Sequence, residues 1–232
     1  MNRLSRAVSA GLNRAVRLGH VGNPVAWRIE ALPDDDESET AVFLSPAQRT
    51  ALIAAAAPQA AAFLRGLELT GARPSELAAA TAGEVDGERL RLTHRKGRRP
   101  RLRSRYVLLD ESGIALCKAQ SKDKSPAASL SVSAKGEPWR RDMWAAEVQR
   151  AITAHNRTAH RHARIPAKAS AYSFRHARIS ELLQVYGVDP LTVAAQTGPS
   201  LRMIERSYYK FIPSAMREKL SRPKATPARQ RA

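Results

Sequence analysis

Two residue types near the C-terminal end of this chain, arginine and tyrosine, suit chemistry on a phosphate group. Arg175 lies just inside the start of an apolar-periodic helix, and the stretch 169–211 ends with the adjacent tyrosines Tyr208 and Tyr209. An arginine fork donates to phosphate oxygens in fixed geometry and keeps its proton. A tyrosine hydroxyl can attack phosphorus and form a covalent intermediate. The stretch therefore suggests a site that clamps and cleaves a phosphodiester.

A second arginine stands in the segment TGARPSEL. Pro74 suits a first helical turn, which places Arg73 at a helix N-terminus, where unpaired N–H groups and the helix dipole favour a phosphate. Glu76 lies in the first turn, where the dipole favours an acid. Position alone leaves a plain surface arginine as an equally good interpretation of Arg73.

A basic β-hairpin is predicted between these arginines. Leu90 and Leu92 alternate with polar residues, and a strand resumes at 106–109 after the turn HRKGRRPR. This turn is either a solvated loop or a tip that enters a DNA groove, where Lys96 could be carried to a specific atom. The candidate DNA-binding residues of the tip are Arg95, Arg98, Arg99 and Arg101.

The remaining periodicity predicts a mainly α fold with a small antiparallel β-sheet. Further helices are expected over 2–19, 45–57, 59–70, 113–119, 140–163, from about 170, and from 189, with a third strand near 130–133. We predict an amphipathic helix in residues 1–30, an acidic linker at 31–42, a main domain at 43–213 and a basic, disordered tail at 214–232.

The charge and composition of the chain limit the kinds of binding partner and cofactor it is expected to have. The net charge of +18 indicates a polyanion, foremost double-stranded DNA. No apolar run is long enough to span a membrane and no secretory signal is present, so a cytoplasmic protein is expected. Cys117 is the sole cysteine, which excludes an intrachain disulfide and a cysteine-based zinc site, and is expected in the core. His155, His160 and His162 lack metal-ligand spacing, so no metal is predicted.

Taken together, TGARPSEL, the hairpin lysine, YSFRHA and MIERSYY resemble the tyrosine recombinase (phage integrase) family over 43–213. The resemblance implies that family's catalytic-domain fold and DNA cleavage and rejoining through a 3′-phosphotyrosine, without metal or cofactor, by a tetramer on DNA. It implies that Arg73 and Arg175 bind the phosphate, that Lys96 protonates the leaving oxygen and that Tyr208 is the nucleophile, with Tyr209 as the alternative. Glu76 would brace the site and His176 would support it.

The chain departs from the family pattern in three places. Tyr172 stands where a histidine is usual, and Pro199, which has no donor, stands where a histidine or tryptophan is usual; Ser200 is a nearby substitute donor. Residues 1–30 resemble only the last helix of the family's core-binding domain. Cleavage is therefore expected to be reduced rather than abolished.

Two alternatives to an active recombinase remain at this stage. One is a catalytically weak or inactive DNA-binding remnant of an integrase that acts by occupying sites. The other is a generic basic nucleic-acid-binding protein. That last interpretation requires Arg73, Arg175 and Tyr208 to lie too far apart to reach one phosphate.

Overall fold

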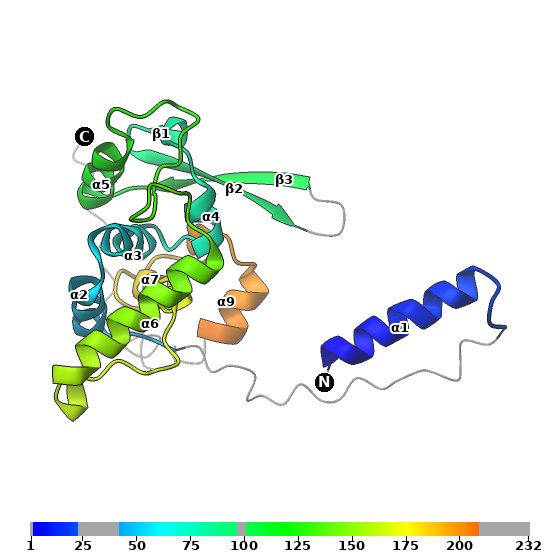
Figure 1. The fold of residues 1–232 in the computed structure, drawn as a ribbon. Coiled ribbons are helices and arrows are strands. Elements are labelled where there is room, and N and C mark those ends of the chain that lie inside the picture. Colours follow the sequence, from blue (N-terminus) through cyan, green and yellow to red (C-terminus); the bar gives the residue numbers. More distant parts are fainter. Residues whose placement is uncertain (1, 23–41, 97–100, 209–232) are drawn as a thin grey trace, which may run out of the picture. The chain divides into compact units, whose positions relative to one another are not determined.

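The computed structural model describes residues 2–22, 42–96 and 101–208. The chain divides into two compact units, one up to residue 41 and one from residue 42 onward. In the first unit, helix α1 (Asn2–Arg17) confirms the predicted helix near the N-terminus (Figure 1). The tail at 214–232 and the linker, apart from Val42, lie outside the described residues.

The second unit consists of helices and a small antiparallel sheet, which confirms the predicted fold class (Figure 1). Its described helices are α2 (Pro46–Ala55), α3 (Pro58–Thr70), α4 (Pro74–Ala79), α5 (Glu111–Ser121), α6 (Arg141–Thr158), α7 (Ala171–Gln184), α8 (Pro190–Thr197) and α9 (Leu201–Tyr208). Its described part also contains the 3₁₀-helices η2 (Ala82–Glu84) and η3 (Arg161–Ala163) and the strands β1 (Val85–Asp86), β2 (Arg89–Lys96) and β3 (Arg101–Leu108).

Local capping contacts set the starts of α2 and α8. Ser45 and Gln48 form a reciprocal capping box at the start of α2. The Asp189 side chain accepts hydrogen bonds from the backbone N–H groups of Leu191 and Thr192 at the start of α8. These signals act within a few residues, so they are readable without tertiary contacts.

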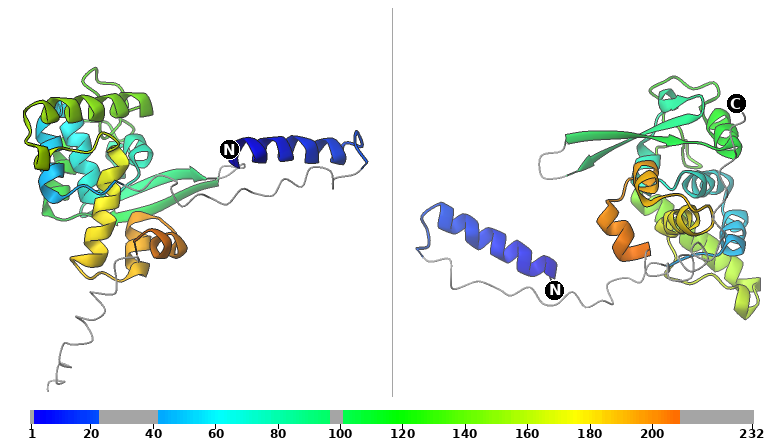
Figure 2. Two further views of the ribbon diagram at one scale, coloured as in Figure 1. Left: turned by 90° about the horizontal axis from the view of Figure 1, so that it is seen from below. Right: turned by 180° about the vertical axis from the view of Figure 1, so that it is seen from behind.

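The sheet has the order β1-β2-β3, and β2 and β3 project beyond the helices (Figures 1 and 2). Their register pairs Leu92 with Arg105 and Lys96 with Arg101. Leu90, Leu92 and Val107 are buried at the base of the hairpin. The hairpin is therefore anchored in the core at one end and carries its basic residues toward the other.

The predicted third strand near 130–133 is wrong. Residues at and beside this segment form only isolated bridges, between Thr81 and Ser129 and between Val132 and Pro138. The third strand of the sheet is β1, which joins β2 through a tight turn in which Gly87 has φ of 56°. Because this turn places β1 beside β2, and β3 occupies the other side of β2, the later segment has no central strand to pair with.

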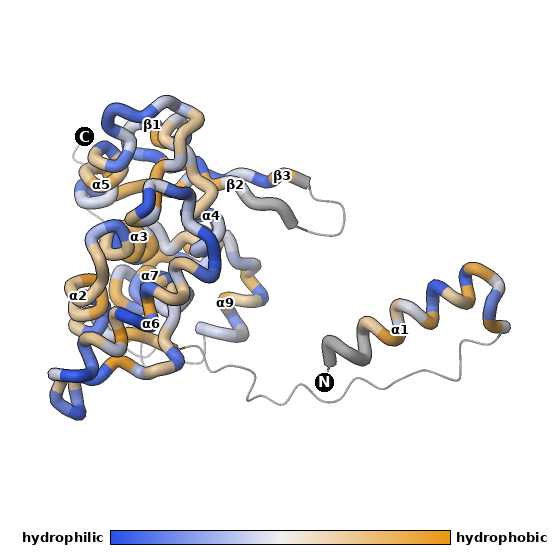
Figure 3. Tube along the Cα trace, viewed as in Figure 1, coloured by the Kyte–Doolittle hydropathy of each residue, from blue (hydrophilic) through white to orange (hydrophobic). Residues whose placement is uncertain are grey.

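The helix predicted over 140–163 is shorter than expected and ends at Thr158. The Asn156 side chain exchanges two hydrogen bonds with the backbone of Ile165, each 2.8 Å long, and His155 Nε2 lies 3.1 Å from the Ala163 carbonyl oxygen. These contacts turn the chain back on itself. Figure 3 shows the end of α6 and the residues after it as largely hydrophilic.

An aromatic cluster lies at the centre of the second unit. The Phe63 ring on α3 packs 5.2 Å from the Trp139 ring and 5.8 Å from the Trp144 ring, measured between centroids. Leu64 and Leu67 extend this core toward α7, against which α3 packs. Cys117 is buried as predicted, and burial raises the pKa of its thiol to about 11.

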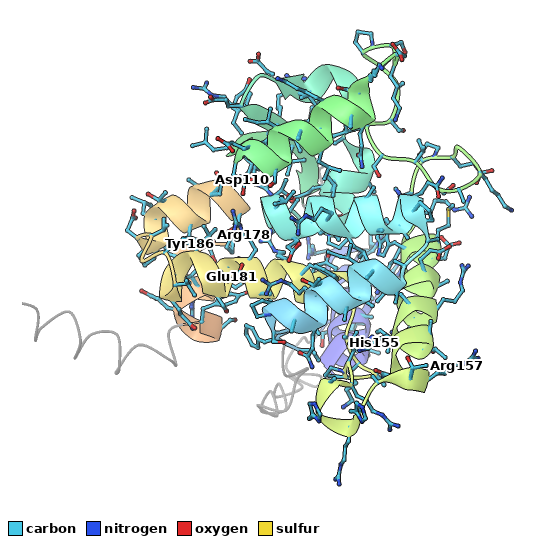
Figure 4. The ribbon with its side chains drawn as sticks, turned by 90° about the vertical axis from the view of Figure 1, so that its left-hand side faces the viewer. Asp110, His155, Arg157, Arg178, Glu181 and Tyr186 are labelled. Carbon is cyan, nitrogen blue, oxygen red and sulfur yellow. The ribbon has the colours of Figure 1, made fainter. Side chains whose placement is uncertain are left out.

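Charged contacts fasten α7 to its neighbours. Arg49 on α2 is 5% exposed and donates from Nε to Glu68, from Nη1 to the Leu44 carbonyl and from Nη2 to Glu181 of α7. On the outer side of α7, Arg178 lies 3.9 Å from the Asp110 carboxylate and over the Tyr186 ring (Figure 4). Every side-chain nitrogen of Arg49 therefore has a partner.

No helix in the described ranges is long and apolar enough to cross a membrane.

Phe63→Ala is expected to lower the free energy of unfolding by about 3–5 kcal/mol, because it leaves a cavity between two tryptophans. Urea unfolding followed by circular dichroism checks this value. Leu191→Ala is the matched control, since Leu191 is 66% exposed and its truncation should change stability by less than about 0.5 kcal/mol. Equal effects of the two substitutions would contradict the assignment of the core.

Candidate phosphate-binding site

Arg73 and Arg175 meet at the turn between α8 and α9. Arg175, on the first turns of α7, donates from Nη1 to the carbonyl oxygens of Gly71 and Thr197, each at 2.6 Å. Arg73 donates from Nη2 to the next carbonyl oxygen, that of Gly198, at 3.1 Å. The two guanidinium groups are thus bound to adjacent peptide units, although 102 positions separate them in the sequence (175 − 73).

Two glycines make this approach possible. Gly71 ends α3 with φ of 63°, and a Cβ there would lie 3.0 Å from Thr197 Cγ2. Gly198 ends α8 with φ of 84°, and a Cβ there would lie 3.0 Å from Cζ of Arg105. Both positions combine the left-handed conformation with close contact, so any side chain would disturb the arginine acceptors.

Glu76 is clamped between two arginines. Its Oε1 accepts from Arg73 Nη1 at 2.7 Å, while its Oε2 accepts from the Arg73 backbone N–H at 3.0 Å and from Arg105 Nη2 at 2.7 Å. The side chain is 1% exposed. Burial raises the pKa of this carboxyl, but the hydrogen bonds and charges of Arg105 and Arg73 outweigh burial and lower it from 4.5 to about 2. Glu76 is therefore ionised wherever the protein is folded near neutral pH.

Arg105 is the site residue that the sequence interpretation missed. It lies on β3, is 12% exposed, and donates from Nε to the Gln196 carbonyl at 3.3 Å. The sequence prediction began the second strand of the hairpin at Tyr106, five residues after its observed start at Arg101, and so left Arg105 just outside it. Extending the alternation backward from the buried Val107 would have placed Arg105 on the inward face.

The site carries a net positive charge. Burial and then the neighbouring charge of Arg73 lower the pKa of Arg175 to about 10, with Glu76 opposing this and Arg105 adding to it. Arg175 still keeps its proton at neutral pH. Three guanidinium groups face one carboxylate, an arrangement suited to binding an anion such as a phosphodiester.

Tyr208 is paired with His176. The phenol oxygen lies 2.6 Å from His176 Nδ1, and the Phe43 ring lies edge-on to Tyr208 with centroids 6.1 Å apart. Tyr208 is 4% exposed and packs with Ile179 and Ile204. Burial raises its pKa to about 12, although the charge of Arg175 acts in the opposite direction. The hydroxyl is therefore protonated in this arrangement.

His176 is neutral and accepts a hydrogen bond. Burial, and then the charge of Arg175, lower the pKa of His176 below its ordinary value of 6.5. The imidazole is consequently neutral at pH 7. With its own proton on Nε2, Nδ1 accepts the hydrogen bond that the Tyr208 hydroxyl donates.

The other predicted residues take separate positions. Tyr172 is 45% exposed on α7. The Ser200 hydroxyl accepts a hydrogen bond of 3.3 Å from the Met203 backbone at the start of α9, and Pro199 before it is buried. Ser200 thus caps a helix, which does not in itself supply the donor that Pro199 lacks.

The hairpin is described by its backbone near the tip. Lys96 is the last residue of β2, and Arg95 precedes it opposite Leu102. Arg101 begins β3. The side chains of residues 94–101 lie outside the description, as do all atoms of Arg98, Arg99 and Tyr209, so their predicted roles stay predictions.

Among the described residues, no group of three or more potential metal ligands comes together. His160 and His162 stack with ring centroids 5.9 Å apart, while His155 turns to the Ala163 carbonyl.

Comparison with solved structures identifies the fold. The chain is similar to the Tn1549 transposon integrase in complex with circular intermediate DNA (TM-score 0.73, 18% identity, 95% of this chain and 78% of that one). It is also similar to a lambda integrase dimer bound to a COC′ core site (TM-score 0.63, 12% identity, 87% of this chain and 72% of that one). A third similar structure is that of XerA recombinase (TM-score 0.57, 16% identity, 97% of this chain and 78% of that one). No family model and no curated protein matches the chain. The fold is that of a tyrosine recombinase catalytic domain.

Glu76→Gln is expected to remove a pH-dependent part of the stability. Because the folded pKa of about 2 lies below the ordinary 4.5, the ionised carboxylate stabilises the folded state above about pH 5. This contribution, of the order of 3 kcal/mol, is lost as the pH falls from about 4.5 toward 2.

Urea unfolding of wild type and variant at pH 7 and pH 3 measures this effect. The difference in unfolding free energy should be smaller at pH 3. Glu88→Gln, which changes an exposed acid, should show little difference at either pH. A gap between wild type and Glu76→Gln that does not depend on pH would disprove the assigned role of the carboxylate.

Proposed function

We propose that this chain, whose fold is that of a tyrosine recombinase catalytic domain, cleaves and rejoins double-stranded DNA through a 3′-phosphotyrosine at Tyr208. The observation that carries the proposal is the convergence of Arg73 and Arg175 on the turn that leads into α9, the helix that ends at Tyr208. The net charge of +18 and the likeness to DNA-bound integrases support DNA as the substrate.

The chemistry assigns one role to each group. Arg73 and Arg175 donate to the non-bridging oxygens, where negative charge grows as the phenolate attacks phosphorus. The bond to the 5′-oxygen breaks, and Lys96 on the hairpin protonates that leaving oxygen. The phosphotyrosine retains the bond energy until a 5′-hydroxyl attacks it, so no metal or nucleotide is required.

His176 takes the proton from Tyr208 in this proposal. The 2.6 Å contact places Nδ1 within proton-transfer distance of the phenol, and the lowered pKa keeps the imidazole unprotonated at neutral pH. Tyr172, which replaces the expected histidine, is a poor base at this pH. His176, to which the sequence interpretation gave a supporting role, thus takes a direct part in the proposed proton transfer.

We further propose that the protein works as a tetramer on DNA in the cytoplasm. The dimeric state of the bound lambda integrase supports association on DNA. The second candidate function is a catalytically weak integrase remnant that occupies DNA sites. Two observations favour it, namely that Pro199 offers no donor to the phosphate and that the Tyr208 hydroxyl is buried.

Tyr208→Phe is expected to abolish a covalent DNA adduct that the wild type forms on a nicked suicide substrate, because the phenyl ring has no nucleophile. Denaturing gel electrophoresis measures the adduct. Tyr209→Phe is the matched control and should retain it. An adduct with Tyr208→Phe and none with Tyr209→Phe would move the nucleophile to Tyr209, whereas steep salt-dependent binding without any adduct would favour the remnant.

His176→Gln is expected to lower the adduct-forming rate at pH 7 by about a hundredfold or more, since it removes the base. The wild-type rate should be flat from pH 7 to 9, above the pKa of His176, whereas the variant rate should rise with pH as the phenol of Tyr208 ionises directly. Single-turnover kinetics over this range test both points. His162→Gln, an exposed histidine, should behave as wild type; a flat profile for His176→Gln would rule out the base.

A further inference from the structure

Arg105 and Arg49 both lie largely inside the second unit and pair with carboxylates, but they differ in how many of their nitrogens have a hydrogen-bond acceptor. Arg49 has a hydrogen-bond acceptor for each of its three side-chain nitrogens. Arg105 has acceptors for Nε and Nη2 only, and its buried Nη1 lacks a partner among the described residues. A buried polar group without a hydrogen-bond partner destabilises the folded state, and more so when it is charged. Stability alone therefore does not account for the position of Arg105.

Arg105 and Arg73 contact the same two parts of the site, the Glu76 carboxylate and the C-terminal end of α8. Both arginines donate to the carboxylate of Glu76, one to each oxygen, at 2.7 Å. Both also donate to the turn that ends α8, Arg105 to the Gln196 carbonyl and Arg73 to the Gly198 carbonyl. The guanidinium of Arg105 lies so close to Gly198 that a Cβ there would be 3.0 Å from its Cζ and Nη1.

Arg105 also belongs to the hairpin that carries Lys96. It lies on β3, opposite Leu92 of β2, in the hairpin whose β2 ends at Lys96. The same turn carries Pro199, which lacks a donor. Arg105 thus brings a cation from the hairpin to the turn in which Pro199 has no donor group.

We propose that Arg105 is a positioning residue that fixes the guanidinium of Arg73 through Glu76 and links the hairpin to the phosphate-binding site. The inference deepens the proposed function and rests on it for the cleavage step. Its structural part, that Arg105 holds Arg73 in place, holds independently of cleavage.

Arginine side-chain NMR tests the structural part without any activity. The Nε–Hε signal of Arg73, assigned by its loss in Arg73→Lys, should be shifted or broadened in Arg105→Met and unchanged in Arg49→Met. Arg49→Met is the matched control because it removes a buried, ion-paired arginine outside the site. If Arg105→Met fails to fold, Arg105→Lys takes its place, because it keeps the charge but loses the planar fork that bridges Glu76 and the Gln196 carbonyl. An unchanged Arg73 signal in the folded variant overturns the proposal.

Single-turnover cleavage at saturating DNA tests the functional part. Arg105→Met should lower the rate by about tenfold or more while changing the DNA Kd by less than about threefold, because positioning acts on the reacting geometry. Arg105→Lys, which keeps the charge beside Glu76, should recover part of this loss.

In an Arg73→Lys background, Arg105→Met should cost less than about threefold, since both act through one guanidinium. Fully additive losses would show that Arg105 acts independently of Arg73 and would overturn the proposal. A wild type that forms no adduct would refute the proposed cleavage function, and the NMR result would then decide the inference by itself.

Discussion

The buried carboxylate of Glu76 is the interaction on which the geometry of this site depends. It lies in the first turn of α4 and binds Arg73, the residue directly before that helix, and Arg105 from β3. A carboxylate that is 1% exposed is tolerated only when it is paired and hydrogen-bonded. These contacts connect the start of α4 to the hairpin, and Arg73 and Arg105 extend the connection to the turn after α8.

The same arrangement leaves a charge imbalance. One acid faces three guanidinium groups, and the lowered pKa of Arg175 reflects both its burial and the repulsion by Arg73. A folded protein ordinarily minimises such repulsion, because like charges held close together destabilise the folded state. A phosphodiester would supply the missing negative charge, which makes the imbalance understandable as preorganisation for an anion.

Tyr208, the proposed nucleophile, is held by contacts of a different kind. Apolar packing against Ile179 and Ile204 places Tyr208, and a hydrogen bond to His176 aligns its hydroxyl. His176 follows Arg175 directly on α7, so one helix carries both an arginine of the anion site and the partner of the tyrosine. The burial that positions the phenol also raises its pKa, and the proposed attack at neutral pH therefore calls for a neighbouring base.

The sequence by itself determined the features that depend on neighbouring residues. Capping at Ser45 and Asp189, the ends of helices at Gly71 and Gly198, and the alternation of the hairpin all arise from interactions within a few positions. The order of Arg73, Lys96, Arg175 and Tyr208 sufficed to indicate the fold through a family resemblance. The prediction of a third strand near 130–133 was wrong because strand pairing depends on which edge of the sheet is available, and neighbouring residues do not determine that.

Only the tertiary structure decided how the charged groups meet. The hydrogen bond from Arg105 to Glu76 spans 29 positions, and that from Arg73 to Gly198 spans 125. The contact between His176 and Tyr208 likewise spans 32 positions. Periodicity identifies the face of an element on which a residue lies but not the residue it meets, because packing of separate elements brings partners together. The partner of each buried charge is therefore set by the fold as a whole.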